Sequence, residues 1–257
     1  MITTFEKNPS HQLRLKDFIA ERAQEFQNSD EITTVALSAF LSGAVDITSV
    51  MCILFFRIAH EPEYQQKMFE ELCQVFGEPT LEEVTSENGL SVSQDQFKKI
   101  RLCRNFVDES MRLNHNYTVS ARKLSKDVVI GGYQVPKDTT IFILENPELS
   151  GRHVPRSTEF IPERFETNFP YAPVNNFCTT PFGLGARKCP GSRIAYSEIV
   201  LALVNIVRNF ELRHSNLTAF PRMETDRSLF YIDTNKHKLY LKPRKHLELY
   251  VHEKVRL

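Results

Sequence analysis

The sequence predicts a mainly α-helical fold with small β-sheets. Long segments repeat apolar residues at intervals of three and four, which is the spacing of an amphipathic helix. Short apolar runs bounded by turn residues lie within 119–144 and near the C-terminus, and they predict strands. The 257 residues are enough for one large core or for two domains.

The composition is that of an ordinary globular protein with a formal net charge of zero. The chain has no basic block, so nucleic acid is not expected as a partner. Its five cysteines are odd in number and have no C-x-x-C spacing, which argues against a disulfide framework or a zinc ribbon. A reducing, intracellular setting is therefore the default. Residues 1–7 lack the apolar core of a signal peptide, so no secretion signal is expected.

Two helices are predicted in the N-terminal part of the chain. Residues 11–26 place apolar side chains near one face, and a longer helix follows at 31–59. The apolar segment 35–58 is long enough to span a membrane, but Asp46 lies in its middle, and a carboxylate at mid-bilayer is costly. We therefore expect a long buried helix with a polar interruption rather than a transmembrane span.

The middle of this long helix carries groups with chemical uses. Gly43 thins the helix, while Asp46 and Thr48 place an acid and a hydroxyl in an apolar wall. The alternative is a kinked helix whose polar side chains bond to backbone carbonyls of the preceding turn. Taken alone, the residues favour the kink.

Two further helices are expected, at 62–76 and 96–113, with a polar loop at 80–93 between them. In the second helix, Glu109 and Arg112 are three residues apart and share one face. An exposed ion pair of this kind contributes roughly 0.5 kcal/mol. The pair therefore indicates little by itself.

Strands are predicted in two regions of the chain. Those of the first region lie at 128–130, 133–135 and 139–144. In the second region, the apolar runs 229–232 and 238–241 are predicted to pair as a hairpin. The charged tail from Pro243 is expected to fray.

A glycine-rich and proline-rich loop at 180–191 precedes an apolar helix that is predicted to be buried. Cys189 lies in this loop, and a helix N-terminus stabilises a thiolate. A thiolate presented by a loop with little side-chain bulk can ligate a metal such as iron, and Arg187 can pair with an anionic group of the same ligand. The alternative is a buried, inert cysteine behind a turn.

The spacing Phe182-x-x-Gly185-x-Arg187-x-Cys189-x-Gly191 resembles the haem-binding signature of the cytochrome P450 family of haem-thiolate monooxygenases. The resemblance implies haem b as cofactor, with the Cys189 thiolate as the axial ligand of the iron. It also implies the fold of that family.

Other motifs resemble those of the same family. Glu109 and Arg112 match its E-x-x-R motif, and Arg164 lies in a P-E-R-F sequence at 162–165 that matches another element. The resemblance implies a buried cluster of these three side chains that locks the thiolate loop. The segment 150–160 departs from the family pattern and is expected to touch no proposed site.

In the long helix, Asp46 and Thr48 resemble the acid and the threonine that relay protons to bound oxygen in this family. The family places the threonine directly after the acid, a position filled here by Ile47, so Thr48 is not an equivalent donor. The resemblance further implies that Arg122 and Arg187 pair with haem propionates. The alternative for Arg122 is a surface arginine at a strand edge.

The resemblance implies an enzyme that inserts one atom of dioxygen into an apolar small molecule. Its electrons would come from a ferredoxin-type donor or a flavoprotein reductase. The motifs run from Asp30 to Lys242 and cover the C-terminal half of the family's domain, so residues 1–257 are interpreted as a partial domain without its N-terminal half. The residues around Asp46 and after Cys189 look more like the mitochondrial, ferredoxin-dependent branch. The mitochondrial inner membrane is therefore favoured over the endoplasmic reticulum.

Two other functions stay open. Ile47 supports a haem-thiolate enzyme of the isomerase or lyase type, which rearranges an oxygenated substrate without a threonine proton relay. The partial domain supports a haem-free, non-catalytic fragment.

Overall fold

The computed structural model of the chain describes residues 29–85, 90–114, 119–144, 153–170, 179–214, 224–226, 229–231 and 238–248. The chain divides into two compact units, residues 1–46 and 47–257, and helix α2 (Ser29–His60) continues through the division. This helix confirms the one predicted at 31–59, whereas the helix predicted at 11–26 lies outside the described residues. The mainly helical fold with small sheets is confirmed as well.

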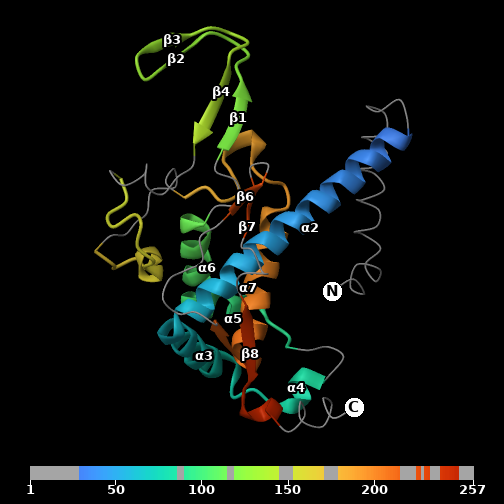
Figure 1. Cartoon of the computed structure of the whole chain (residues 1–257), viewed down its shortest axis with the longest axis vertical. Coiled ribbons are helices and arrows are strands. Elements are labelled where there is room, and N and C mark those ends of the chain that lie inside the picture. The colour runs from blue at the N-terminus through green and yellow to red at the C-terminus, as the bar shows by residue number, and fades with distance from the viewer. Residues whose placement is uncertain are drawn as a thin grey trace. The chain divides into compact units, whose positions relative to one another are not determined.

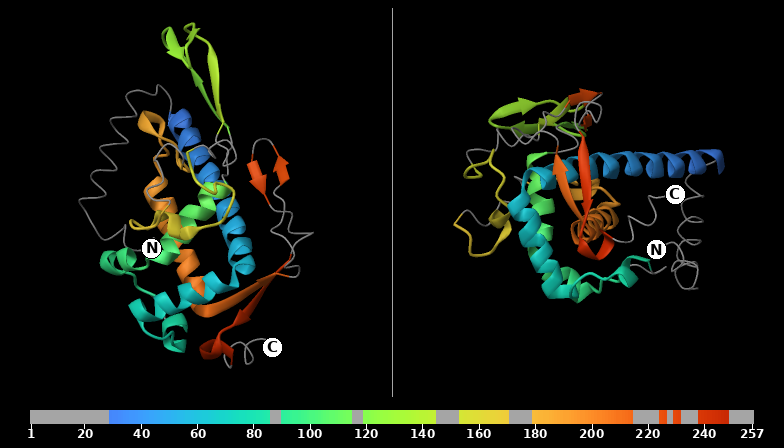
Figure 2. Two further views of the ribbon diagram at one scale, coloured as in Figure 1. Left: turned by 90° about the vertical axis from the view of Figure 1, so that its left-hand side faces the viewer. Right: turned by 60° about the horizontal axis from the view of Figure 1, so that its bottom comes forward.

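The core of the second unit is formed by the last turns of α2 and by the helices α3 (Pro62–Phe76), α6 (Arg101–Leu113) and α7 (Ser192–Asn209). Figure 1 shows α6 and α7 side by side, and Figure 2 gives the same helices from two other directions. The apolar residues of α3, α6 and α7 with no exposed surface are Met68, Leu72, Cys103, Phe106, Val107, Val200, Leu203, Val204 and Val207.

Helix α3 begins at Pro62 and ends before Gly77, whose φ of +79° favours glycine. Its buried Gln65 side chain makes two hydrogen bonds to the backbone of one residue, as a neighbouring strand would. The Gln65 side-chain amide donates to the Leu212 carbonyl at 3.1 Å and accepts the Leu212 N–H at 2.7 Å. These two bonds join α3 to strand β5 (Phe210–His214).

The single helix predicted at 96–113 is wrong, because α5 (Gln94–Lys99) and α6 are separate and meet at Ile100. The N-terminus of α6 is capped from another helix. The Glu71 carboxylate of α3 accepts the backbone N–H groups of residues 102 and 103, at 2.8 and 3.1 Å. This cap is a tertiary contact, so helical periodicity alone did not reveal the break.

The loop predicted at 80–93 is wrong over part of its length, since α4 (Leu81–Thr85) lies within it. Thr80 Oγ1 accepts the backbone N–H of Glu83 at 3.2 Å and so caps this helix. The Glu83 carboxylate in turn accepts two bonds, at 3.0 and 2.7 Å, from the buried Arg208 of α7. A distant arginine therefore holds a segment whose own sequence is polar.

Four two-stranded antiparallel sheets are present in the described part of the chain. Strand β1 (Val119–Lys123) pairs with β4 (Thr140–Leu144), and β2 (Val128–Ile130) pairs with β3 (Tyr133–Val135). Figure 1 shows these two pairs following one another as a long ribbon. The strands predicted in this region are confirmed.

The hairpin predicted between 229–232 and 238–241 is wrong. Strand β7 (Leu229–Tyr231) pairs with β6 (Glu224–Asp226), and β8 (Leu239–Pro243) pairs with β5. The strand that leaves α7 thus pairs with the last strand rather than with a neighbour in sequence. Apolar runs identify strands, but the partner of each strand depends on the three-dimensional path of the chain.

Helix α7 is the helix predicted to be buried after the glycine-rich loop, and that prediction is wrong for its beginning. Ile194 is 67% exposed, and complete burial begins at Ile199. An apolar sequence indicates that a helix favours burial. Which turns of α7 are buried depends on how far the surrounding core extends along the helix.

The tail predicted to fray from Pro243 is folded over residues 243–248, and the rest of it lies outside the described residues. The backbone N–H of Arg244 donates to the Asn209 carbonyl at 2.9 Å, and its Nε donates to the Val207 carbonyl at 2.8 Å. Leu247 follows with only 2% of its surface exposed. The tail therefore satisfies carbonyl groups at the C-terminal end of α7.

Among the described residues, one stretch of α2, Leu41–His60, is long and apolar enough to cross a membrane. The core helix of a soluble protein passes the same test of length and composition. Ile53, Leu54 and Phe56 of this stretch are 1% exposed and contribute to the core. Leu41 and Val45 are 68% and 52% exposed, so the prediction of a long buried helix is wrong for the earlier turns of the stretch.

Candidate functional site

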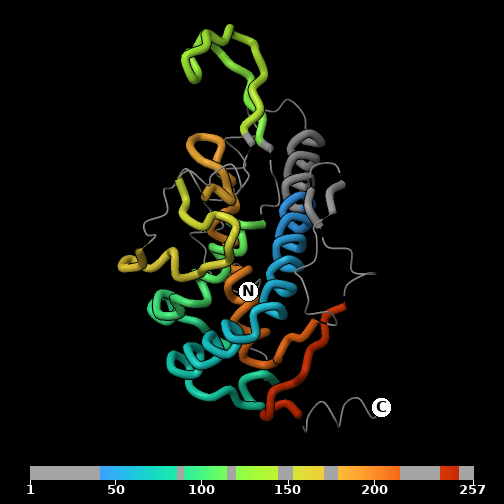
Figure 3. Tube along the Cα trace, turned by 60° about the vertical axis from the view of Figure 1, so that its left-hand side comes forward, coloured from blue at the N-terminus to red at the C-terminus, as the bar shows by residue number. Residues whose placement is uncertain are grey.

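The loop that presents Cys189 is held by its own backbone. The Cys189 N–H donates to the Phe182 carbonyl at 2.8 Å, and the Cys189 carbonyl accepts the Ser192 N–H at 3.3 Å, at the start of α7. Gly183 and Gly185 have φ values of +71° and +69°, where other residues are strained. Figure 3 shows the loop turning back at the beginning of α7. The glycine spacing is therefore required by the backbone path.

Cys189 differs from the other three described cysteines in its exposure. Its side chain is exposed, Cys103 is buried, and Cys52 and Cys73 are half-buried. Burial raises the pKa of the Cys103 thiol well above its usual range and also raises those of Cys52 and Cys73. The alternative of a buried, inert cysteine thus describes Cys103 and not Cys189.

The surface around Cys189 suits an amphipathic planar group such as haem. Leu184 and Ile194, on either side of the cysteine in sequence, are 46% and 67% exposed, and Arg187 is exposed as well. Within the described residues, no three His, Cys, Asp or Glu side chains gather to hold a bare metal ion. A single thiol fits one axial position on a metal held by other donors, and the exposed apolar and cationic side chains fit a macrocycle with carboxylates.

Glu109, Arg112 and Arg164 meet in the core. Arg112 donates to both Glu109 oxygens at 2.7 and 2.8 Å, and Arg164 Nε donates to Glu109 Oε1 at 3.0 Å. The three residues are 0%, 1% and 0% exposed. The ion pair that the sequence alone left as an exposed surface contact is thus a buried, bidentate one.

The cluster has one more positive than negative charge, and backbone carbonyls surround the two arginines. Arg112 donates to the carbonyls of Ser157 and Glu159 at 2.6 and 3.2 Å, and Arg164 donates to those of Pro155 and Arg156 at 2.7 and 3.0 Å. The expectation that the segment 150–160 touches no proposed site is therefore wrong. Every residue has a backbone carbonyl, so the sequence could not show which carbonyls accept hydrogen bonds from the two arginines.

The turn that carries Arg164 (Pro162–Phe165) is fixed on two further sides. The Tyr64 hydroxyl of α3 donates to both oxygens of Glu163, at 2.9 and 2.7 Å, and the Asn105 amide of α6 donates to Glu166 at 2.7 Å. The Tyr64 and Phe160 rings pack edge to face at 5.9 Å. Sequence reasoning missed Tyr64, which lies within the helix predicted at 62–76 and was given no role there.

The remaining predicted residues are placed as follows. Arg122 lies within β1, is half-buried, and donates to the Ala121 carbonyl at 2.7 Å. Gly191 directly precedes α7, and a side chain built on it would be in ordinary contact with the Cys189 sulfur at 3.9 Å. Asp46 is the last residue of the first unit and is half-buried, whereas Thr48 is exposed in the second.

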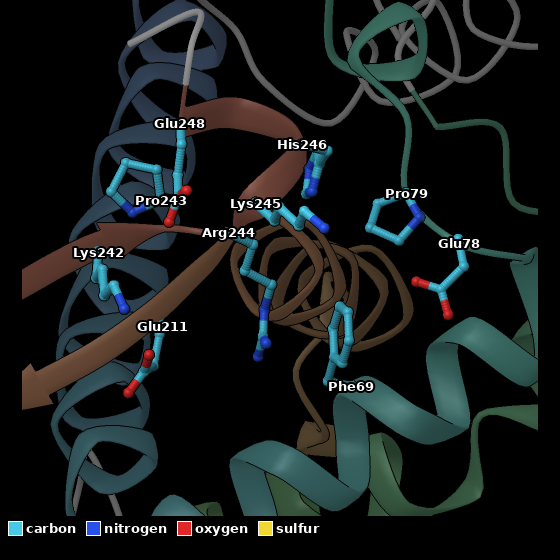
Figure 4. A pocket seen from close by; sticks show the side chains of 10 residues that line it. All are labelled: Phe69, Glu78, Pro79, Glu211, Lys242, Pro243, Arg244, Lys245, His246 and Glu248. Carbon is cyan, nitrogen blue, oxygen red and sulfur yellow. The ribbon is translucent and has the colours of Figure 1, made fainter. Parts of the chain in front are cut away.

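A pocket of about 700 Å³ lies elsewhere in the second unit, between α3, β5, β8 and the C-terminal turn. Figure 4 shows the Arg244 side chain directed toward Phe69, and its guanidinium carbon lies 3.7 Å from the ring centroid. The lining includes Glu78, Glu211 and Lys242 and none of the predicted site residues. Its mixed charges do not match an apolar substrate.

Comparison with known proteins adds an independent observation. The model of the family described as Cytochrome P450 matches residues 4–241. The chain is 32% identical over 208 residues to "Probable cytochrome P450 12c1, mitochondrial" of Drosophila melanogaster. This match covers 77% of the present chain and 38% of the Drosophila protein. It is 32% identical over 193 residues to "Cytochrome P450 27C1" of Danio rerio, a match that covers 74% of this chain and 34% of the relative. It is 27% identical over 212 residues to "Aromatase" of Equus caballus, a match that covers 82% of this chain and 39% of the relative. The chain thus spans less than two fifths of the length of these relatives.

Proposed function

Because the chain belongs to the cytochrome P450 family, we propose that it forms the thiolate-bearing part of a haem-thiolate monooxygenase. When bound, haem supplies the oxygen-activating chemistry, which a cysteine thiolate ligand promotes. One atom of dioxygen enters an apolar small molecule. The observation that carries the proposal is the exposed Cys189 thiol, which the glycine turns of its loop present at the surface.

The residues of the loop have separate roles in this proposal. The Cys189 thiolate would hold the iron of haem b, and Phe182, Gly185 and Gly191 would shape the loop so that backbone can approach the macrocycle. Arg187 pairs with a propionate, because it is exposed two residues from the cysteine and an arginine binds carboxylates well. Arg122 is proposed to pair with the other propionate.

We assign proton delivery to Asp46 and Thr48 of α2. A carboxyl and a hydroxyl in an apolar helix can hold and pass a proton through water. Ile47 fills the position between them, so the relay requires water or Asp46 itself as the immediate donor.

Glu109, Arg112 and Arg164 have a structural role. Their bonds tie α6 to the turn at 162–165 and to the backbone of 155–159. We propose that this rigid frame supports the cysteine loop, as the family resemblance implies. Residues 1–257 correspond in this proposal to the C-terminal part of the family's domain. The relatives support a part rather than the whole, since the matches cover 38% and 39% of their length.

The electron donor is proposed to be a ferredoxin rather than a flavoprotein reductase, at the mitochondrial inner membrane rather than the endoplasmic reticulum. The support is that relatives with "mitochondrial" in their names are among the matches. Reconstitution of the holoenzyme with each donor tests the choice, and turnover with the flavoprotein alone would contradict it.

The decisive experiment is the reduced carbon monoxide difference spectrum of the haem-loaded chain. A Soret band of the thiolate type is expected for the unaltered chain and for Cys73→Ser, a half-buried control. Cys189→Ser is expected to lose that band while retaining its helical circular dichroism. A thiolate band that survives in Cys189→Ser contradicts the proposal. A chain that takes up no haem supports the non-catalytic fragment instead.

Ile47 favours a second candidate function, an isomerase or lyase that needs no threonine relay. The variant Ile47→Thr separates the two in the holoenzyme. If the enzyme is a monooxygenase limited by proton delivery, the ratio of product formed to oxygen consumed is expected to rise. An unchanged ratio counts against a relay defect.

A further inference from the structure

The hairpin formed by β2 and β3 exposes apolar side chains that the core does not use. No side chain between residues 128 and 135 is charged, and Gln134 is the only fully polar one. Val129, Ile130 and Tyr133 are 69%, 45% and 77% exposed. Within the described part of the chain, no residue of this segment belongs to an apolar cluster or packs against one.

The register of the two strands gathers apolar side chains on one face of the hairpin. Ile130 is the partner of Tyr133, and Val128 is the partner of Val135. Side chains two residues apart in a strand point to the same side, so these four residues form one continuous apolar face. The two glycines of the turn have φ values of +57° and +86°, which a tight two-residue hairpin turn requires. The tip of the hairpin therefore carries neither bulk nor charge.

Two lysines lie at the base of the hairpin. Lys126 precedes β2 and Lys137 follows β3, and both are exposed. The nearby acids are bound within the ribbon itself. Asp127 Oδ1 accepts the backbone N–H of Lys137 at 2.7 Å, and Asp138 pairs with Lys123 at 3.3 Å. The Lys126 and Lys137 side chains form no ion pair with any described residue, so they can bind an anion from outside the chain.

The size of the apolar face indicates what covers it. β2 and β3 form a sheet of their own, and Figure 1 shows them at the far end of the ribbon that begins with β1 and β4. A two-stranded hairpin is marginal in water unless its apolar face is covered. A stable protein interface buries about 800 Å² on each partner and involves roughly 20 residues, far more than this face provides.

A membrane surface fits the order of side chains along the hairpin. Apolar groups of interfacial segments enter the lipid by about 5–10 Å, and tyrosine favours the boundary with water. Four residues of extended chain, from Lys126 to Ile130, span up to about 13 Å. When the tip enters the lipid, the two lysines therefore lie level with the headgroups, where anionic lipids attract them.

We propose that the β2–β3 hairpin docks on an anionic membrane surface. Ile130 and Tyr133 enter the lipid, and Lys126 and Lys137 contact the lipid phosphate groups. This inference deepens the proposed membrane location by naming the segment that makes the contact. It does not depend on Cys189, and its test requires no haem.

The first test places a fluorescent probe at the tip. The chain has no tryptophan, so Tyr133→Trp introduces a single indole in the full chain. With vesicles of phosphatidylcholine and about one third phosphatidylglycerol, we expect its emission to shift to shorter wavelength and to be quenched by brominated lipid. Tyr240→Trp on β8 is the matched control, because Tyr240 is 54% exposed, and it should show neither effect. No change at position 133, or equal quenching at both positions, overturns the proposal.

The second test removes the apolar tip. The double variant Ile130→Thr, Tyr133→Thr keeps residues that favour strands and should lower the partition of the chain onto the same vesicles about tenfold. The control Leu81→Gln, Val84→Gln removes two apolar side chains from α4 that are 40% and 37% exposed. Its expected effect is less than about twofold. Equal losses in the two double variants contradict docking through the hairpin.

The third test removes the charge at the base. Lys126→Gln, Lys137→Gln is expected to weaken binding to the anionic vesicles about tenfold, whereas Lys98→Gln, Lys99→Gln on α5 should change it less than about twofold. Equal binding of the unaltered chain to neutral and anionic vesicles overturns the proposal.

A second copy of the chain is the competing occupant of this face. An emission shift of Tyr133→Trp that grows with protein concentration in the absence of vesicles would assign the face to that copy and overturn membrane docking. A failure of haem binding would contradict the proposed function while leaving the vesicle results intact. A failure of vesicle binding would leave the role of Cys189 intact.

Discussion

Arg164 Nε lies 3.0 Å from Glu109 Oε1, although the two residues are 55 positions apart and neither has any exposed surface. The same oxygen also accepts the backbone N–H of Ile161 at 2.9 Å. One carboxylate thus organises two arginines and a backbone turn. The stability of this region should depend on its charge.

Glu109→Gln is expected to destabilise the chain by ~3–5 kcal/mol, because it leaves two buried guanidinium groups without a counter-charge. The measurement is urea unfolding followed by circular dichroism. Glu82→Gln, at an exposed position of α4, is the control and is expected to change stability by less than ~0.5 kcal/mol. Equal midpoints for the two variants would show that the cluster contributes little.

Gly185→Ala and Gly43→Ala are expected to act in opposite directions. A methyl group at either position meets nothing within 4 Å, so only the backbone distinguishes them. Gly185 has a φ of +69°, and alanine there is expected to cost ~1 kcal/mol. Gly43 lies inside α2, where alanine is expected to stabilise by ~0.5–1 kcal/mol. Thermal unfolding of both variants checks this, and a stabilising Gly185→Ala would refute the strained turn.

The stability of the chain is expected to depend on pH through Asp108. Its pKa rises from 3.8 to about 6 on folding, chiefly because of burial. Between these values the folded chain binds more protons than the unfolded chain, so the free energy of unfolding contributed by Asp108 falls as the pH increases from about 4 to about 6.

Asp108→Asn should remove this fall. Relative to the unaltered chain, the variant is expected to gain ~1–2 kcal/mol between about pH 4 and pH 7, less than the ~3 kcal/mol of a fully buried group because Asp108 is partly exposed. Denaturant titrations at several pH values measure the difference. Asp95→Asn, at an exposed position, should follow the unaltered chain at every pH.

Arg187→Ala is expected to weaken haemin binding about tenfold, because it removes a charge-assisted contact to a propionate. Lys188→Ala is the matched control, since it removes the same charge from the adjacent exposed position. Its expected effect is less than about twofold. Spectroscopic titration gives both affinities, and similar losses would indicate general attraction between charges rather than a specific pair.

Several features of this protein were predictable from the sequence because they depend on neighbouring residues. The apolar spacing predicted α2 and α3. The glycines near Cys189 predicted a tight loop, and the two positive φ values there are a local property of the backbone. The spacing of the loop motif also indicated the family that the comparisons show.

The tertiary structure alone decided features that depend on distant residues. Glu71 divides the helix predicted at 96–113, strand β8 pairs with β5, and the carbonyls of 155–159 surround Arg112 and Arg164. A carbonyl group or a strand edge is the same in every sequence, so its partner can be identified only after the chain has folded. The sequence by itself determined which residues favour helix, turn and burial. The fold decided which groups meet, because burial and contact belong to the arrangement of the whole chain and not to any one segment.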